Sequence, residues 1–206
     1  MRVFFFDTET AGLPKARVVA QEGAGNWAAP VSISWIILEE NKQHETKSYL
    51  IRPKGWIIPE DSIKIHKITN ERADSEGYSL DEVITEFNAD LSSCDAVVAH
   101  NFYFDKNTII SAAMYLCSPM IPIRWPRYQI CTMEASRNIC CLPFANPRPN
   151  DRFKPPQLQE FYQFCFGHPP PDDMLHSSLG DVQIMIQCFF KHWTLPQIEE
   201  LCKKSR

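Results

Sequence analysis

Two carboxylates, Asp7 and Glu9, directly follow the most apolar run of the chain, VFFF at residues 3–6. Side chains alternate along a strand, so both acids are predicted to share one face with Val3 and Phe5, one pleat apart. Buried ionised carboxylates are costly, and neighbouring negative charges raise each other's pKa unless they hold a cation between them. In either case the stretch is interpreted as a candidate functional site.

Three later stretches carry residue types that could complete such a site. Each offers a carboxylate or an imidazole close to a predicted helix or strand end. They are IKIHKIT (63–69) with His66, VVAHNFYFD (97–105) with Asp105, and HSSLGDV (176–182) with His176 and Asp181.

Taken singly, these residues also have ordinary structural explanations. Asp105 could be the N-cap of its helix, and Asp181, three residues after Ser178, could be the acidic half of a capping box. His176 is one of six histidines. Asp7 and Glu9 resist such an explanation, because core strands rarely carry two acids on one face without a ligand.

The elements expected around these residues predict an α/β fold. Two β-branched runs joined by a short polar connection indicate an antiparallel hairpin, and Ser79 with Glu82 indicates a capping box before an amphipathic helix. The order β-β-β-α-β-α-(β)-α-α predicts one sheet with helices packed on it, in a single domain over residues 1–206. The expected segments are strands at 31–38, 46–52, 96–100 and 128–131, helices at about 105–117 and 178–193 and one ended by Gly167, and a proline-rich loop at 142–156.

The composition narrows the function classes. With 44% apolar and 22% charged residues, the chain is an ordinary globular protein, and no segment approaches the roughly 20 apolar residues of a membrane span. A net charge of −4 does not indicate a protein that grips long duplexes by their phosphates, so any nucleic-acid contact should be local.

The cysteines and the N-terminus predict an intracellular protein. The eight cysteines include no CxxC pair, which favours buried, reduced thiols in a cytoplasmic or other reducing compartment over a zinc site or a disulfide frame. The acids at positions 7 and 9 interrupt the first apolar run, so a signal peptide is not expected and the protein is predicted not to be secreted.

The motifs DTETAGLP, HNFYFD and HSSLGDV, in this order, resemble the three motifs of the DEDDh family of 3′–5′ exonucleases. The likeness is greatest to the proofreading (epsilon) exonuclease domain of bacterial DNA polymerase III and its stand-alone relatives. It runs nearly end to end, because IHKIT resembles the family's IHGIT segment, and ICTMEASRNICCLP and PPQLQEFYQFCFG resemble its connecting region. The resemblance implies an RNase H-like fold, a central mixed sheet of about five strands flanked by helices.

The resemblance also implies the catalytic residues. Asp7, Glu9, Asp105 and Asp181 match the acids that hold two Mg²⁺ ions, for which Mn²⁺ can substitute, and His176 matches the general base. Such a pair of ions, about 3.5–4 Å apart, activates water and stabilises the leaving oxygen, and hard cations of this kind prefer carboxylate oxygens. Five helical residues turn the chain by about 140°, so His176 must come from the preceding HPPPDDML loop. That loop is predicted to be mobile until substrate binds.

Substrate contacts are inferred from the same likeness. Leu13 and Ile65 would pack on the terminal base, with ordinary core packing as the alternative. The pocket is completed by Thr8 (through its backbone), His66 and Asn101. Residues 102–104 could stack on bases or belong to the core, and Lys106, Arg152 and Lys154 could meet phosphates or simply face solvent.

The chain departs from the family pattern at a few positions. Lys67 stands where IHGIT has glycine, Lys64 is also unusual, and Ala11 replaces a commoner threonine, so the backbone near residue 67 is expected to differ. Ser177 and Gly180 vary within the last motif and are expected to touch no ligand. None of these changes removes a catalytic group, which favours an active enzyme. The short end, KKSR, favours a free-standing nuclease over a polymerase-bound one.

Three functions follow in order of preference. The first is a 3′–5′ exonuclease that acts on single-stranded DNA ends and releases nucleoside 5′-monophosphates. The second has the same chemistry but trims RNA or short oligonucleotides, since sugar choice depends on how the pocket approaches the 2′ position. The third is a non-cleaving protein that binds nucleic acid or a polymerase, whose expected signature would be a lost acid or histidine. The expected partner is a nucleic-acid 3′ end, not a membrane, and a polymerase or a second copy is left open.

Overall fold

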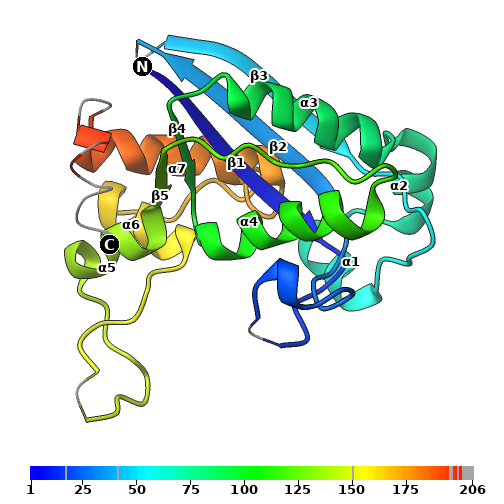
Figure 1. Cartoon of the computed structure of the whole chain (residues 1–206). Coiled ribbons are helices and arrows are strands. Elements are labelled where there is room, and N and C mark those ends of the chain that lie inside the picture. Colours follow the sequence, from blue (N-terminus) through cyan, green and yellow to red (C-terminus); the bar gives the residue numbers. More distant parts are fainter. Residues whose placement is uncertain (17, 41, 150, 195–196, 199, 201–206) are drawn as a thin grey trace.

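The computed structural model describes residues 1–16, 18–40, 42–149, 151–194, 197–198 and 200. Its five strands form one sheet in the order β3-β2-β1-β4-β5 (Figure 1). Strand β1 pairs antiparallel with β2 and parallel with β4, so the sheet is mixed, as predicted. The strands are β1 (Arg2–Thr10), β2 (Pro30–Glu39), β3 (Lys42–Leu50), β4 (Ala96–Ala99) and β5 (Tyr128–Cys131).

Helices cover both faces of this sheet, which confirms the predicted α/β class. On one face, α3 packs on an aromatic core, and α4 lies beside it. On the other, α7 and α6 pack on a second core, with α5 at its edge. The helices are α1 (Glu60–His66), α2 (Asn70–Glu76), α3 (Leu80–Ser92), α4 (Phe102–Ser111), α5 (Thr132–Cys140), α6 (Leu158–Phe166) and α7 (Ser178–His192).

The central strand β1 places alternate residues in the two cores, as its sequence predicted. Phe4 and Phe6 contact the ring of Phe87 on α3, with centroids 5.0 and 5.3 Å away. Val3 and Phe5 instead face α7, where Phe5 meets Phe189 edge-on with a centroid separation of 5.3 Å. Both faces of β1 are therefore fixed by fully buried side chains before the strand reaches its acids.

Two helix starts differ from the predicted ones. Helix α4 begins at Phe102, three residues earlier than expected, because Asn101 adopts a left-handed backbone (φ 66°) and turns the chain directly out of β4. Asp105 is thus inside the first turn and is not the N-cap. Helix α3 does follow Ser79, but that hydroxyl makes no capping bond, so the predicted capping box is wrong.

A genuine capping box occurs at α6, between Gln157 and Glu160, where none was predicted. The chain also contains α1, α2 and α5, which the predicted element order left out or left undecided, and a π-helical segment (Ala112–Leu116) that extends α4.

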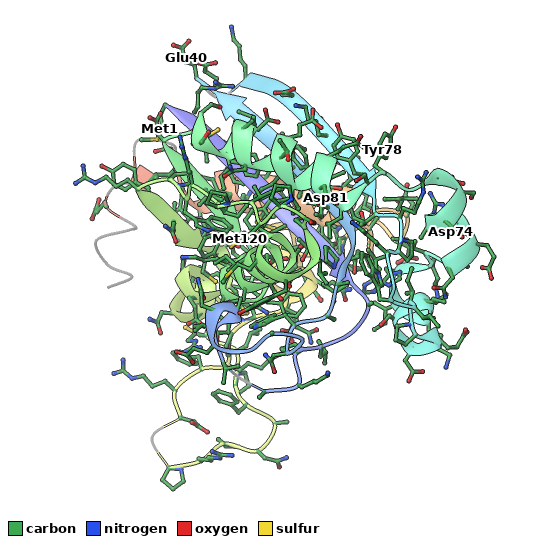
Figure 2. The ribbon with its side chains drawn as sticks, turned by 45° about the vertical axis from the view of Figure 1, so that its right-hand side comes forward. Met1, Glu40, Asp74, Tyr78, Asp81 and Met120 are labelled. Carbon is green, nitrogen blue, oxygen red and sulfur yellow. The ribbon has the colours of Figure 1, made fainter. Side chains whose placement is uncertain are left out.

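The remaining features concern the outline of the molecule. The proline-rich loop 142–156 extends away from the body between α5 and α6 (Figure 1). In Figure 2, Glu40 at the β2–β3 turn lies at the top of the view, and Asp74 on α2 lies at its right-hand side. Every cysteine in the described residues is a free thiol, and Cys202 lies outside them. Among the described helices, none combines the length and apolarity that crossing a membrane requires.

Candidate active site

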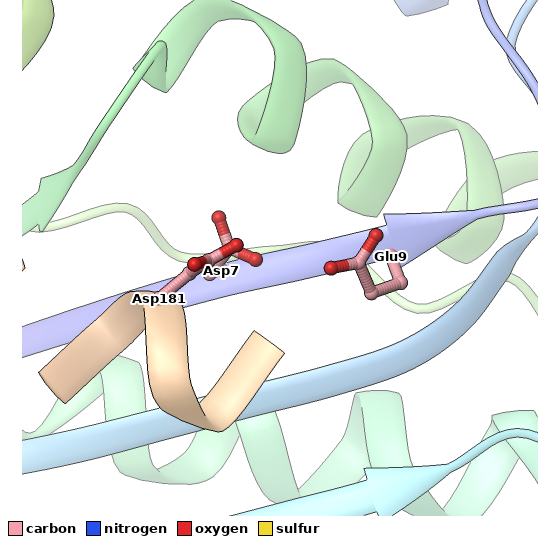
Figure 3. A group of neighbouring side chains, drawn as sticks. All are labelled: Asp7, Glu9 and Asp181. Carbon is pink, nitrogen blue, oxygen red and sulfur yellow. The ribbon is translucent and has the colours of Figure 1, made fainter. Parts of the chain in front are cut away.

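Three carboxylates converge where β1 passes the first turn of α7. Asp7 and Glu9 come from β1 and Asp181 from α7, and each offers an oxygen within 4.8 Å of the other two (Figure 3). The strand period explains why both β1 acids point toward α7, since they continue the face that carries Phe5. The structure therefore brings together three of the four predicted ligands in one group.

The fourth acid, Asp105, is buried beside this group on α4. Its Oδ1 accepts two hydrogen bonds from Thr8, one from the backbone N–H at 3.1 Å and one from the hydroxyl at 2.8 Å. Its charge also raises the pKa of Asp7 and Glu9, which places it within electrostatic reach of both. Thr8 thus holds the Asp105 carboxylate where its charge acts on the converging acids, although it lies outside their group of three.

All four acids resist ionisation, chiefly because they are buried. Burial, and then repulsion by neighbouring acids, raises the pKa of Asp7 well above its usual range and that of Glu9 to about 8. Burial also raises the pKa of Asp105 and of Asp181 to about 7, although Thr8 and the His176 amide partly offset this by hydrogen bonding. At neutral pH the site therefore holds fewer negative charges than its four carboxylates could carry.

No salt bridge in the described residues joins these acids to a basic side chain. Lys106 follows Asp105 in sequence, but its Nζ donates to Gln129 Oε1 at 2.7 Å and lies over the rings of Phe102 and Trp125. A set of converging carboxylate oxygens without a protein cation is the donor set that hard divalent ions prefer. The residues present thus fit a divalent metal.

His176 lies in the turn just before α7, where the sequence placed it. Its backbone is left-handed (φ 58°), a conformation that costs a non-glycine residue roughly 1–2 kcal/mol. The backbone N–H donates to the Asp181 carboxylate, and the ring Nε2 lies 3.5 Å from Gln159 Nε2 on α6. The turn is therefore tied to the acid site, while the exposed imidazole points toward α6.

The first turn of α7 depends on Ser177 and Gly180, two residues that were expected to touch no ligand. The Ser177 hydroxyl accepts from the Gly180 N–H at 3.1 Å and caps the helix, so the capping box considered for Asp181 with Ser178 is wrong. A Cβ on Gly180 would lie 1.9 Å from the Met174 carbonyl oxygen. Only glycine lets the loop before His176 pack this closely on α7.

Beside Glu9 lies a mainly apolar cavity of about 230 Å³. Leu13 and Ile65 border it while remaining 80% and 55% exposed, so the alternative of core packing is wrong for both. The other predicted substrate residues that line it are Thr8 and His66, whereas Asn101 is not among the lining residues. The Thr8 N–H is already used by Asp105, so it is not free for a substrate.

His66 lines this cavity as a buried side chain. Its Nδ1 accepts from the Ile68 N–H at 3.1 Å, and burial lowers its pKa, so the ring is neutral at physiological pH. Lys67, at the position where the family motif has glycine, ends α1 in a left-handed conformation (φ 60°). Lys67 therefore occupies, under strain, a backbone conformation that glycine at this position would adopt freely.

The other residues proposed to contact substrate differ in how exposed their side chains are. Phe102 belongs to the core, whereas Tyr103 is 42% exposed and packs against Trp27. Lys154 is paired with Glu160, and Arg152 is exposed on the extended loop. Of these residues, Tyr103 and Arg152 have surface free for a ligand.

Of residues 102–104, which were expected either to stack on bases or to belong to the core, Phe104 lines the cavity together with Leu13. Sequence reasoning missed one residue at the site. Gln159 meets the His176 ring, and no local signal marked it, because its position depends on how α6 packs against the turn before α7.

Comparisons with known proteins identify the family and the fold. Residues 4–189 match the family RNase_T, described as Exonuclease. Exonuclease X in complex with 5′ overhanging duplex DNA is 21% identical with a TM-score of 0.58, covering 97% of this chain and 99% of that one. Escherichia coli Exonuclease I bound to a dT13 oligonucleotide is 16% identical with a TM-score of 0.65, covering 97% of this chain.

A third similar structure is Exonuclease I from Methylocaldum szegediense, 17% identical with a TM-score of 0.63, covering 96% of this chain. The chain spans only 42% and 41% of the Escherichia coli and Methylocaldum chains, respectively. These likenesses show the RNase H-like α/β fold. No curated protein sequence matches the chain significantly.

Proposed function

Because this chain belongs to the exonuclease family, as a nuclease of the DEDD type, we propose that it removes nucleoside 5′-monophosphates from the 3′ ends of single-stranded DNA with the help of two divalent ions. The observation that carries the proposal is the convergence of Asp7, Glu9 and Asp181, with Asp105 beside them. Four neighbouring acids of raised pKa, Asp105 buried and the other three half-buried, make a poor structural element and a good metal site.

Asp7, Glu9, Asp105 and Asp181 would hold the ions. When bound, two Mg²⁺ or Mn²⁺ ions would supply a nucleophile near neutral pH and neutralise charge on the phosphate and the leaving oxygen. The chain's own part is to keep these oxygens convergent. Thr8 fixes the Asp105 carboxylate, and the His176 amide fixes that of Asp181.

His176 would serve as the general base, taking a proton on a ring nitrogen. An imidazole is suited to this task near pH 7, provided that it reaches the attacking water. Its Nε2 now lies beside Gln159, so we expect the ring to leave α6 and turn toward the acids when substrate binds. The turn that carries it is the part of the site for which we predict motion.

The cavity beside Glu9 would receive the terminal nucleotide. Leu13 and Ile65 offer exposed apolar surface to the base, and Phe104, one of the residues proposed to stack on bases, adds an aromatic ring to the lining. Similar structures contain DNA, dT13 in one and a 5′ overhanging duplex in another, which supports DNA as the substrate.

The test is degradation of matched 5′-labelled single-stranded DNA and RNA with Mg²⁺, Mn²⁺ or EDTA. We expect a metal-dependent ladder that shortens from the 3′ end, faster on DNA, and lost in Asp7→Ala and His176→Ala. His168→Ala, an exposed histidine of the preceding loop, is the matched control and should cleave normally. Faster cleavage of RNA would reassign the substrate, and retained binding without cleavage of either would overturn the enzyme proposal.

A further inference from the structure

Three buried serine hydroxyls join β2 to the start of α7 directly behind the acid site. Ser178 Oγ lies 2.5 Å from Ser32 Oγ and 2.7 Å from Ser34 Oγ. These residues are 146 and 144 positions apart in sequence, and all three are at most 4% exposed. Such short bonds in a buried place fix the distance between the strand and the helix.

Because each hydroxyl has one proton to donate, the donor and acceptor of every hydrogen bond in this chain are determined. Ser34 donates to Ser48 on β3 at 2.8 Å, and a hydroxyl has a single proton. Ser34 must therefore accept from Ser178, and Ser178 must accept from Ser32. Each bond in the chain requires the next, so removing one hydroxyl leaves a neighbour with a lost partner.

The register of the sheet puts this network next to the metal ligands. Ser32 is paired with Glu9 across β1 and β2, and Ser34 is paired with Asp7. Residues opposite each other in an antiparallel pair point to the same face, so these hydroxyls lie beside the two acids. Asp181 follows Ser178 by three residues on α7, which is about one helical turn.

We infer that Ser32, Ser34 and Ser178 are positioning residues that set where Asp181 stands relative to Asp7 and Glu9. The inference rests on the proposed metal-dependent function. Three carboxylates whose oxygens lie within 4.8 Å of one another repel each other when they are ionised, and this repulsion tends to separate β1 from α7 before an ion binds. A hydrogen-bonded tie between β2 and α7 opposes that separation and keeps the site ready for the ion.

The experiment measures Mn²⁺ affinity by electron paramagnetic resonance, without substrate, and Tm for each variant. Ser178→Ala should weaken Mn²⁺ binding about tenfold, the low end of the roughly 10–100-fold range for residues that support metal ligands. Ser32→Ala and Ser34→Ala should weaken it less, because each removes one of the two bonds to Ser178. Saturating Mn²⁺ should restore much of the cleavage rate in all three variants.

Two matched serines serve as controls. Ser136→Ala removes a buried hydroxyl on α5 that donates to the Met133 carbonyl, and Ser48→Ala removes the far end of the chain of hydroxyls. Ser136→Ala should lower Tm at most and leave Mn²⁺ affinity unchanged. Ser48→Ala should change Mn²⁺ affinity less than Ser32→Ala, Ser34→Ala or Ser178→Ala. If Ser178→Ala does not fold, Ser32→Ala and Ser34→Ala decide the question.

The outcomes separate the two proposals. Normal Mn²⁺ affinity in the folded network variants, whatever their Tm, would overturn the positioning role and leave the nuclease proposal standing. Failure of the wild type itself to bind Mn²⁺ would overturn both. A loss of affinity confined to the network variants and absent in Ser136→Ala supports the inference.

Discussion

The face of the sheet under α7 has two halves of opposite chemistry. In the first half, Val3 and Phe5 of β1 lie opposite Leu38 and Ile36 of β2, and the far part of α7 covers them with Phe189. In the second half, the same two strands place acids opposite serines, and the first turn of α7 covers them with Ser178 and Asp181. One strand pair and one helix thus make both a core and a site.

The difference separates what stabilises the protein from what the proposed reaction needs. The apolar half gains stability from burial, whereas the acidic half loses stability whenever its carboxylates ionise without a cation. The apolar half can hold the acidic half in place because both belong to the same rigid elements. Changes in one half should therefore affect stability, and changes in the other should affect activity.

The largest expected effect is on activity, in Asp181→Asn. The ions are expected to supply several kcal/mol to the reaction, so kcat should fall at least about 10³-fold. Without metal at pH 8, Tm should stay equal or rise, because the neutral amide ends repulsion with Asp7 and Glu9. Asp74→Asn on peripheral α2 is the control in single-turnover assays and thermal unfolding (Figure 2). A large loss of Tm in Asp181→Asn would contradict the view that the apolar half determines stability and the acidic half determines activity.

The second effect is on stability, in Phe5→Ala. This ring is fully buried and packs on Phe189, so its loss should lower the free energy of unfolding by about 3–5 kcal/mol. Urea unfolding measures it, and Phe190→Ala, whose ring is 37% exposed, should be milder. The folded fraction of Phe5→Ala should keep its Mn²⁺ affinity, and a loss there would mean that the two halves are not independent.

The third prediction concerns pH. The pKa of Asp105 and Asp181 is about 7 and that of Glu9 about 8 in the folded protein, against ordinary values near 4 in the unfolded chain. The folded state therefore binds more protons between about pH 4 and 8, and these acids lower stability as pH rises through that window. Without metal, Tm should fall by about 5 °C or more from pH 5 to 8, since roughly 2–4 °C corresponds to 1 kcal/mol.

Two comparisons sharpen the pH prediction. Mg²⁺ should raise Tm strongly at pH 8 and little at pH 5, because bound ions favour the ionised carboxylates. Asp181→Asn should flatten the pH dependence of Tm. An equal slope in this variant would show that the titration arises outside the acid site.

The smallest expected effect is in Leu13→Ala, at the mouth of the cavity. This side chain is 80% exposed, so its removal should leave Tm unchanged. Lost packing on the terminal base should raise KM about fivefold, which corresponds to about 1 kcal/mol. Ile57→Ala, 79% exposed and not among the cavity's lining residues, is the matched control and should behave as the wild type in steady-state assays.

The sequence by itself determined the features that depend on local periodicity and motif order. Alternation along β1 predicted that Asp7 and Glu9 share a face with Phe5, and helical geometry predicted that His176 precedes the helix carrying Asp181. The motif order indicated the exonuclease family that the comparison shows. These inferences succeeded because strand and helix periods are properties of a few consecutive residues.

Tertiary structure decided the contacts between distant residues that no motif marked. Nothing in the sequence pointed to the serines of β2, and only the register of the sheet pairs Ser32 with Glu9 and Ser34 with Asp7. The contact of Gln159 with His176 and the raised pKa values likewise depend on packing between elements far apart in sequence. Register, burial and helix docking are set by the whole core, so no local pattern encodes the distances on which a metal site depends.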